Sequence, residues 1–223
     1  MLVDSPSARL LLDCGATALL GLHAAAIEVA SIDAVLISHF HGDHYGGLPF
    51  LILDQQFAKR RTSLIVAGPP GVEARVRSAF DALYPGSTTA AHEAVDVRYV
   101  ELGRVPTPIG GASVTALPVA HLQTTAPHGL RVTLDGRTVA YSGDSAWCDA
   151  LPALADGADL FICECYSFEK RIPSHLDHAT LVAHRDELRA SRTILTHLGP
   201  DALGEIGRSE FAVASDGLEV VLG

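Results

Sequence analysis

Four residues that can bind metal ions lie within six positions of one short segment. The four are His39, His41, Asp43 and His44. They follow the apolar run 34–37, which is typical of a buried strand because small polar residues bound it. If the backbone stays extended beyond this run, side chains alternate, so the first two histidines point to one face and can share one ion. Gly42 permits a tight turn that brings the other two beside them. One ion rarely accepts four side chains from so short a loop, so the spacing favours two adjacent ions.

The segment Ser38-His39-Phe40-His41-Gly42-Asp43-His44 resembles the H-x-H-x-D-H signature of the metallo-β-lactamase superfamily, specifically its ribonuclease Z-like and phosphodiesterase-like branch. This resemblance covers essentially the whole chain and implies three further ligands. His121 follows an apolar segment at the place of the family's third histidine, Asp144 lies in a Ser-Gly-Asp-Ser box similar to the family's S-G-D-T, and His197 ends a Leu-Thr-His run. The resemblance implies one ion held by His39, His41 and His121, and a second held by Asp43, His44 and His197, with Asp144 bridging.

A carboxylate suits the bridging position because it offers two oxygens to ions about 3.5 to 4 Å apart. Imidazole and carboxylate ligands without a thiolate favour two zinc ions, with manganese or iron as alternatives. Such ions lower the pKa of a shared water toward neutrality, which predicts hydroxide attack on phosphorus or on a carbonyl carbon. The resemblance implies that Asp43 also orients or deprotonates this water. As general acid we expect His175, a histidine outside the ligand set that titrates near neutral pH, with His178 and His184 as competitors.

Two acidic residues are expected to support the ligands. Leu12-Asp13-Cys14-Gly15 resembles the D-x-G motif at which the family turns from strand to helix, and a carboxylate there orients ligands by hydrogen bonds. Glu164 lies where relatives carry an acidic residue near the site. Its neighbours Cys163 and Cys165 are interpreted as buried strand thiols, because free cysteine is usually buried and no companion C-x-x-C is present.

Apolar runs alternate with helical patterns along the chain, and each expected ligand follows a strand. The layer rules then favour two sheets packed face to face with helices outside. The resemblance implies the αββα metallo-β-lactamase sandwich of mixed sheets, an α/β fold, as a single domain over 1–223. Relatives usually begin with a further strand and a Gly-rich loop, which are absent here, so we expect an abbreviated or late-starting N-terminus. Expected elements include hairpins over 1–13 and across Asp135-Gly136, helices over 16–30, 48–57 and 72–83, and strands at 64–67, 158–165 and 192–198.

Composition limits the classes of partner. Hydrophobic residues make up 48% of the chain and charged residues 19%, as in an ordinary globular protein. No apolar stretch approaches the ~18 residues of a membrane span, and the first residues do not resemble a signal peptide, so a cytoplasmic protein is expected. The net charge of −10 argues against a general nucleic-acid binder. The basic cluster Lys59-Arg60-Arg61 is interpreted as a solvated helix end rather than a phosphate contact.

The leading hypothesis is a dinuclear-metal-dependent phosphodiesterase acting on a small phosphodiester, such as a cyclic nucleotide. Enzymes of the family that process transfer RNA carry a long basic arm, often between the third histidine and the bridging aspartate, whereas here 122–143 holds only a hairpin. The alternatives are a lactone or thioester hydrolase, a ribonuclease Z-like nuclease, and a metal-binding protein with impaired catalysis. Relatives are often dimers, but no segment of this sequence establishes a homodimer.

Overall fold

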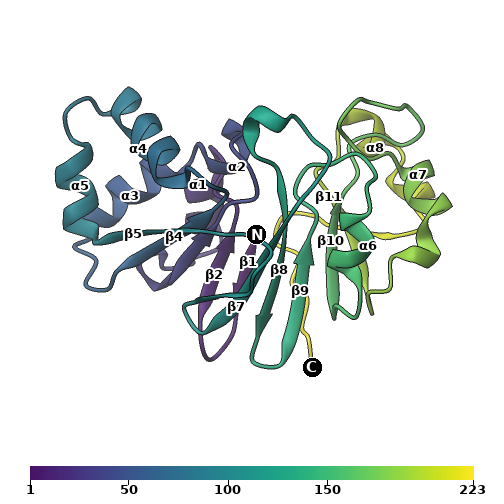
Figure 1. The fold of residues 1–223 in the computed structure, drawn as a ribbon, viewed down its shortest axis with the longest axis horizontal. Helices are drawn as coiled ribbons and strands as arrows, with labels where there is room; N and C mark the ends of the chain where they lie inside the picture. Colours follow the sequence, from purple (N-terminus) through teal and green to yellow (C-terminus); the bar gives the residue numbers. More distant parts are fainter. The chain divides into compact units, whose positions relative to one another are not determined.

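The computed structural model describes every residue from Met1 to Gly223. By their internal contacts the residues form two compact units, Met1–Ser113 and Val114–Gly223. Each unit combines strands of a mixed sheet with helices (Figure 1). These two mixed sheets confirm the predicted α/β class.

The sheet of the first unit has the order β1-β2-β3-β4-β5. Its strands are β1 (Leu2–Asp4), β2 (Arg9–Leu12), β3 (Ala34–Leu36), β4 (Leu64–Gly68) and β5 (Val97–Glu101). The first two form the predicted hairpin, with Leu2 opposite Leu11. The other pairs are parallel, and β2 and β3 are almost fully buried, as apolar strands of a parallel sheet are. The carboxyl ends of β2 and β3 therefore lie side by side, which positions the loops that follow them.

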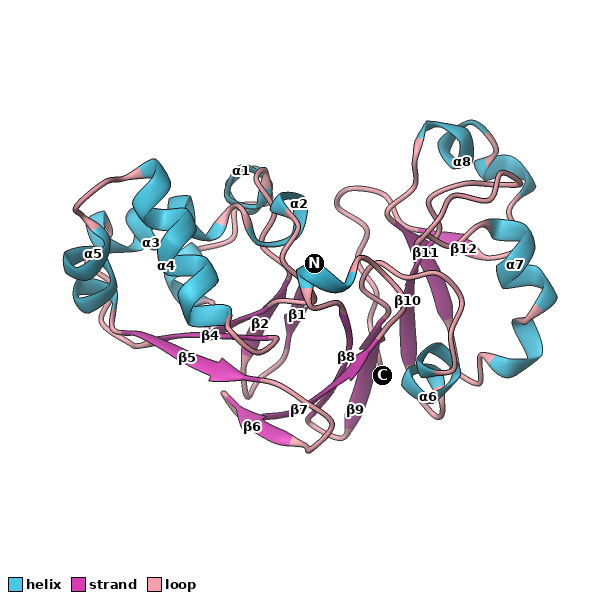
Figure 2. Cartoon of the chain, turned by 45° about the horizontal axis from the view of Figure 1, so that its top comes forward, coloured by secondary structure: helices cyan, strands magenta, loops and turns pink.

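Helices of the first unit connect these strands. They are α1 (Ala18–Ala24), α2 (Gly42–Tyr45), α3 (Leu48–Phe57), α4 (Val72–Leu83) and α5 (Thr88–Val95), with a 3-10 turn at Val29–Ser31. Helices α3, α4 and α5 lie together on the same side of β4 and β5 (Figure 2). The helix expected over 16–30 is shorter than predicted, because Ala26 adopts a left-handed backbone with φ of 54° and ends the helical path.

Arg60 is a structural residue of this unit and does not lie at a solvated helix end. Its side chain is buried, with 8% of its surface exposed. The guanidinium donates to the carbonyl oxygens of Ala30 (3.1 Å), Ile32 (2.6 Å), Thr62 (2.8 Å) and Ser63 (3.0 Å). Burial lowers its pKa. The interpretation of this cluster as solvated is therefore wrong for Arg60, because five planar N–H donors can satisfy several converging loop carbonyls at once.

The second sheet has the order β12-β11-β10-β9-β8-β7-β6. Its strands are β6 (Thr107–Ile109), β7 (Ala112–Pro118), β8 (His128–Leu134), β9 (Arg137–Tyr141), β10 (Leu160–Glu164), β11 (Thr193–Thr196) and β12 (Ala212–Val213). Strands β8 and β9 are antiparallel across Asp135 and Gly136, whose φ angles of 48° and 78° are those of the predicted tight hairpin turn. Strands β9 to β12 are parallel, so β9, β10 and β11 end at one edge.

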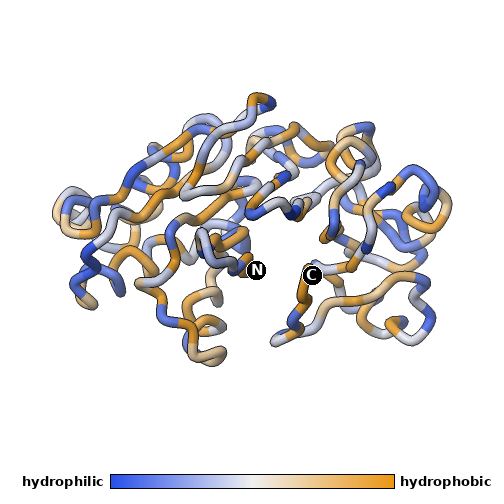
Figure 3. Tube along the Cα trace, turned by 90° about the horizontal axis from the view of Figure 1, so that it is seen from below, coloured by the Kyte–Doolittle hydropathy of each residue, from blue (hydrophilic) through white to orange (hydrophobic).

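Helices of the second unit are α6 (Ala150–Ala155), α7 (His178–Ala183) and α8 (Pro200–Gly204), with 3-10 turns at Gln123–Thr125, Arg185–Glu187 and Ile206–Arg208. Leu151 and Leu154 of α6 pack with Phe161 of β10 in the core of this unit. Asp177 caps α7 by accepting a hydrogen bond from the amide of Thr180 (2.7 Å). Hydrophobic and hydrophilic residues alternate along the chain in both units (Figure 3). None of the helices has the length and apolar character needed to span a membrane.

Candidate metal centre

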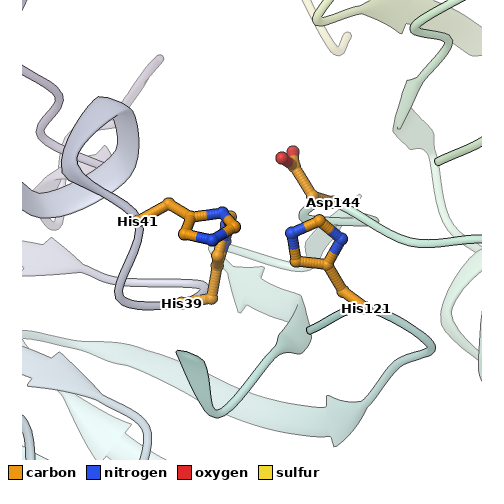
Figure 4. A group of neighbouring side chains, drawn as sticks. All are labelled: His39, His41, His121 and Asp144. Carbon is orange, nitrogen blue, oxygen red and sulfur yellow. The ribbon is translucent and has the colours of Figure 1, made fainter. Parts of the chain in front are cut away.

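The loop after β3 places two histidine nitrogens face to face. His41 has an extended backbone, with φ of −84° and ψ of 147°, as predicted. Nε2 of His39 lies 3.1 Å from Nδ1 of His41 (Figure 4). Phe40 points elsewhere and packs on Tyr45. Two zinc-bound nitrogens in tetrahedral geometry are about 3.3 Å apart for bonds of about 2.05 Å, so the separation fits a shared ion.

The Asp13 carboxylate orients the ring of His44 directly and that of His39 through Ser38. Its Oδ2 lies 2.7 Å from Nδ1 of His44. Because a carboxylate only accepts, Nδ1 of His44 carries the proton and Nε2 keeps its lone pair. The same oxygen accepts from the Ser38 hydroxyl (2.8 Å), whose oxygen in turn accepts from Nδ1 of His39 (3.1 Å). Both histidines thus present Nε2 as the ligating atom, an arrangement typical of metal-bound imidazole.

Glycines at two positions allow the loops after β2 and β3 to touch through their backbones. A Cβ on Gly15 would lie 2.0 Å from the carbonyl oxygen of Asp43, and a Cβ on Gly47 would lie 2.0 Å from that of Gly15. Backbone hydrogen bonds join Cys14 to His44 and to Gly47 (2.7 and 2.8 Å). Gly42, in contrast, begins helix α2 with ordinary φ and open space around it. The requirement for glycine therefore falls on Gly15 and Gly47 rather than on the predicted turn at Gly42.

Asp43 and His44 both lie on the short helix α2, and they differ in exposure. Oδ2 of Asp43 is 3.6 Å from Nε2 of His44. The Asp43 side chain is 65% exposed, whereas that of His44 is 5% exposed. The Asp43 carboxylate is therefore accessible to solvent and to a ligand, while His44 is fixed by Asp13.

His121 is oriented by a backbone carbonyl of the second unit. Its Nδ1 lies 2.8 Å from the carbonyl oxygen of Ser174, which leaves Nε2 as the acceptor. Ser174 has φ of 67°, a left-handed conformation that is uncommon for a residue other than glycine and that concentrates at functional sites. The loop of His121 is joined to that of Asp144 because the amide of Ala120 donates to Oγ of Ser145 (3.1 Å).

Asp144, His175 and His197 lie together in the segments that follow β9, β10 and β11. Their ligating atoms all lie within 4.8 Å of one another. Oδ2 of Asp144 is 3.5 Å from Nε2 of His197, and Asp144 is 2% exposed. His197 also has a left-handed backbone, with φ of 55°. A carboxylate and two imidazoles so close together form a donor set suited to a divalent cation.

Glu164 lies buried behind these histidines. Both its carboxylate oxygens are 3.2 Å from Nδ1 of His175, and Oε2 is 4.0 Å from Nδ1 of His197. Burial raises the pKa of Glu164, an effect that its hydrogen bond with His175 opposes. The amide of Ser145 also donates to this carboxylate. The contact fixes a proton on Nδ1 of His175, so Nε2 is the ring nitrogen that is available to an ion or to a substrate.

The other expected residues are placed as follows. His178 is buried against Phe168, at 4.4 Å between ring centroids, and its Nε2 accepts from the amide of Glu210. Burial lowers its pKa. His184 stacks on Trp147 and contacts Glu187. Of the three candidates for general acid, only His175 lies beside Asp144 and His197.

None of the free cysteines belongs to the groups of side chains that could hold a metal ion. Cys163 and Cys165 are buried on and after β10, as predicted, and Cys148 is half-buried. Burial raises the pKa of Cys165 to about 12 and that of Cys14 to about 12. Thiols held protonated in this way are poor metal ligands.

Each unit thus carries donors whose chemistry fits metal binding. Four are in the first unit (His39, His41, Asp43, His44), and four are in the second (His121, Asp144, His175, His197). Sequence reasoning missed the supporting contacts from Ser38 and Ser174. The only signal for them was that each directly precedes a histidine of the candidate site.

The strand order and the histidine-rich loops define the class of the protein: a metallo-β-lactamase fold with a candidate metal centre. Residues 8–198 match the family model described as a beta-lactamase superfamily domain. The chain therefore belongs to the beta-lactamase superfamily, which confirms the resemblance drawn from the sequence.

Relatives and solved structures agree with this assignment. The chain is 33% identical over 189 residues to an uncharacterized protein of Mycobacterium leprae, a match covering 82% of this chain and 65% of the relative. It is 29% identical to a ribonuclease Z of Mycobacterium bovis, covering 72% of this chain and 61% of that protein. Its fold is similar to a diphosphatase from the PhnP family (21% identity, TM-score 0.80, covering 100% and 83% of the two chains). It is also similar to the short form of human tRNase Z (20% identity, TM-score 0.77, covering 100% and 91%). The chain thus spans 65% of the length of the M. leprae protein.

Proposed function

We propose that this protein is a metal-dependent hydrolase that cleaves a small phosphodiester. Support comes from the family, from relatives named ribonuclease Z and diphosphatase, and above all from histidines whose Nδ1 atoms are anchored so that Nε2 faces a ligand. In this proposal His39, His41 and His121 would hold one ion, Asp43, His44 and His197 would hold the second, and Asp144 would serve both. Zinc is the ion that we expect, with manganese or iron as alternatives.

When bound, the two ions would lower the pKa of a water and supply the nucleophile. The protein's own residues carry the remaining tasks. Asp43, exposed and adjacent to His44, orients the attacking water by accepting a hydrogen bond from it, or deprotonates it as the general base. His175 donates a proton from Nε2 to the leaving oxygen, since Glu164 holds Nδ1 and stabilises the charged ring. The buried carboxylate thereby has the orienting role that a second acid often has behind a catalytic histidine.

Charge and loop structure favour a small substrate over a folded RNA. Between His121 and Asp144 the chain forms only a 3-10 turn and the β8–β9 hairpin. The two arginines of this hairpin are engaged within the unit: Arg131 donates to the carbonyl of Leu154 (2.6 Å), and Arg137 pairs with Asp159 (3.0 Å). With a net charge of −10, the chain offers no basic arm for phosphate-rich partners in this segment.

The test is turnover of bis(p-nitrophenyl) phosphate by the purified protein with added zinc or manganese, beside lactone and thioester substrates. We expect phosphodiester cleavage that is lost in His41→Ala and retained in His23→Ala, a substitution of an exposed histidine outside both donor groups. Turnover of lactones or thioesters alone would assign the protein to carbonyl-ester hydrolysis instead. Tight metal binding with no turnover on any substrate would favour a metal-binding protein.

A further inference from the structure

Tyr166 lies where three loops of the second unit meet, two residues beyond Glu164. Its amide donates to the carbonyl of Leu176 (3.0 Å), which ties it to the loop of His175. Its carbonyl accepts from the amide of Gly199 (2.8 Å), which ties it to the loop of His197. The end of β10 is thereby joined to both histidine loops through one residue.

The ring of Tyr166 packs against both histidines. Its centroid lies 4.9 Å from that of His175 and 5.8 Å from that of His197. These two imidazoles are nearly parallel, at 10° and 5.7 Å. An aromatic ring that contacts both fixes their planes, and plane orientation decides whether a ring nitrogen points at an ion.

Gly199 provides the space that the tyrosine ring occupies. A Cβ at this position would lie 3.1 Å from both Cε1 and Cζ of Tyr166 and 2.7 Å from its carbonyl oxygen. The ring therefore lies directly against the backbone that follows His197. Because His197 has the left-handed φ of 55°, its conformation needs surrounding contacts to persist, and the Tyr166–Gly199 contact supplies them.

We propose that Tyr166 is a positioning residue that holds His197 and His175 in the orientation required for metal binding and proton transfer. The role belongs to the aromatic ring and not to the hydroxyl, because the contacts with both histidines and with Gly199 are made by ring and backbone atoms. This inference rests on the proposed function, in which His197 is a ligand of the second ion.

The test measures zinc affinity by competition with a chromophoric chelator, together with thermal unfolding, and does not need an assay of activity. We expect Tyr166→Ala to weaken the binding of one zinc equivalent by about 10- to 100-fold, the usual cost of losing a contact that orients a ligand. Tyr166→Phe keeps the ring and should bind zinc as the wild type does. Gly199→Ala should reproduce the loss, because its methyl group would collide with both the carbonyl oxygen and the ring of Tyr166.

Tyr84→Ala is the matched control. Tyr84 is also half-buried, and its ring packs on Phe80 at 5.2 Å in the first unit. This variant should lose thermal stability without losing zinc affinity. Equal zinc affinity in Tyr166→Ala and the wild type overturns the inference, as does a loss in Tyr166→Phe as large as that in Tyr166→Ala. Absence of zinc binding by the wild type itself would instead remove the proposed function.

Discussion

Replacing Asp13 by asparagine should cost metal affinity although the side-chain shape is kept. Oδ1 of Asp13 accepts from the amide of Ser38 (2.7 Å), and Oδ2 accepts from the Ser38 hydroxyl and from Nδ1 of His44. In all three contacts the Asp13 side chain must be the hydrogen-bond acceptor. An asparagine supplies one acceptor and one donor, so one end of the amide must face a hydrogen-bond donor.

If the amide oxygen stays with the Ser38 amide, the NH2 group faces His44. Nδ1 of His44 must then accept, its proton moves to Nε2, and the atom expected to bind the ion is blocked. Loss of such an orienting partner typically costs about 10- to 100-fold in metal affinity, which corresponds to about 1.4 to 2.8 kcal/mol. The effect reaches His39 as well, because Ser38 links its Nδ1 to Asp13.

The assay is zinc competition against a chromophoric chelator for the wild type and Asp13→Asn. Asp33→Asn is the control, since the exposed Asp33 carboxylate accepts a backbone hydrogen bond from Arg9 (2.8 Å) in the same unit but contacts no candidate ligand. We expect the control to bind zinc normally. Affinity of Asp13→Asn within about threefold of the wild type would refute the assignment of Nε2 as the ligating atom of His44.

Two further predictions concern stability. Arg60→Met leaves several loop carbonyls without their donor, so we expect a loss of about 3 kcal/mol or more in the free energy of unfolding, measured in urea, with the exposed neighbour Arg61→Met near wild type. A loss below about 1 kcal/mol would contradict the structural role. Burial lowers the pKa of His92 in the folded protein below the ordinary histidine value near 6.5. Between these two pKa values the unfolded protein binds more protons than the folded protein does. The free energy of unfolding must therefore rise with pH in this range and level off above about pH 6.5. His92→Gln should flatten this rise in unfolding experiments from pH 5 to pH 8, whereas the exposed His23→Gln should not; equal slopes would refute the assignment.

The sequence predicts the fold well because its signals are local. The hairpin over 1–13, the helices at 48–57 and 72–83 and the turn at Asp135-Gly136 are recovered close to their predicted bounds. Each depends on periodicity or turn chemistry within a few residues. The helix expected over 16–30 is longer than the observed one. Its apolar pattern continues past Ala26, but the backbone leaves the helical conformation at that residue.

Contacts between segments that are distant along the chain could not be predicted from the sequence. Arg60 is the clearest case: its basic neighbours suggest solvent, but its partners at Ala30 and Ile32 lie about thirty residues away in sequence. The need for glycine at position 15 likewise arises from the carbonyl of Asp43 and not from the turn in which Gly15 lies. A sequence reports residue types and spacing, whereas these requirements depend on which backbones touch.

The same distinction separates the candidate ligands from the residues that make them effective. Histidines and aspartates at strand ends are recognisable because few other roles need them in that order. Their orientation depends on ordinary groups: the hydroxyl of Ser38, the carbonyl of Ser174, and the ring of Tyr166. Of these, only Ser38 and Tyr166 act through side chains, and Ser174 acts through its backbone. Substitutions of Ser174 that tolerate a left-handed φ should therefore preserve the orientation of His121, whereas a substitution that removes the ring of Tyr166, such as Tyr166→Ala, should not preserve that of His197.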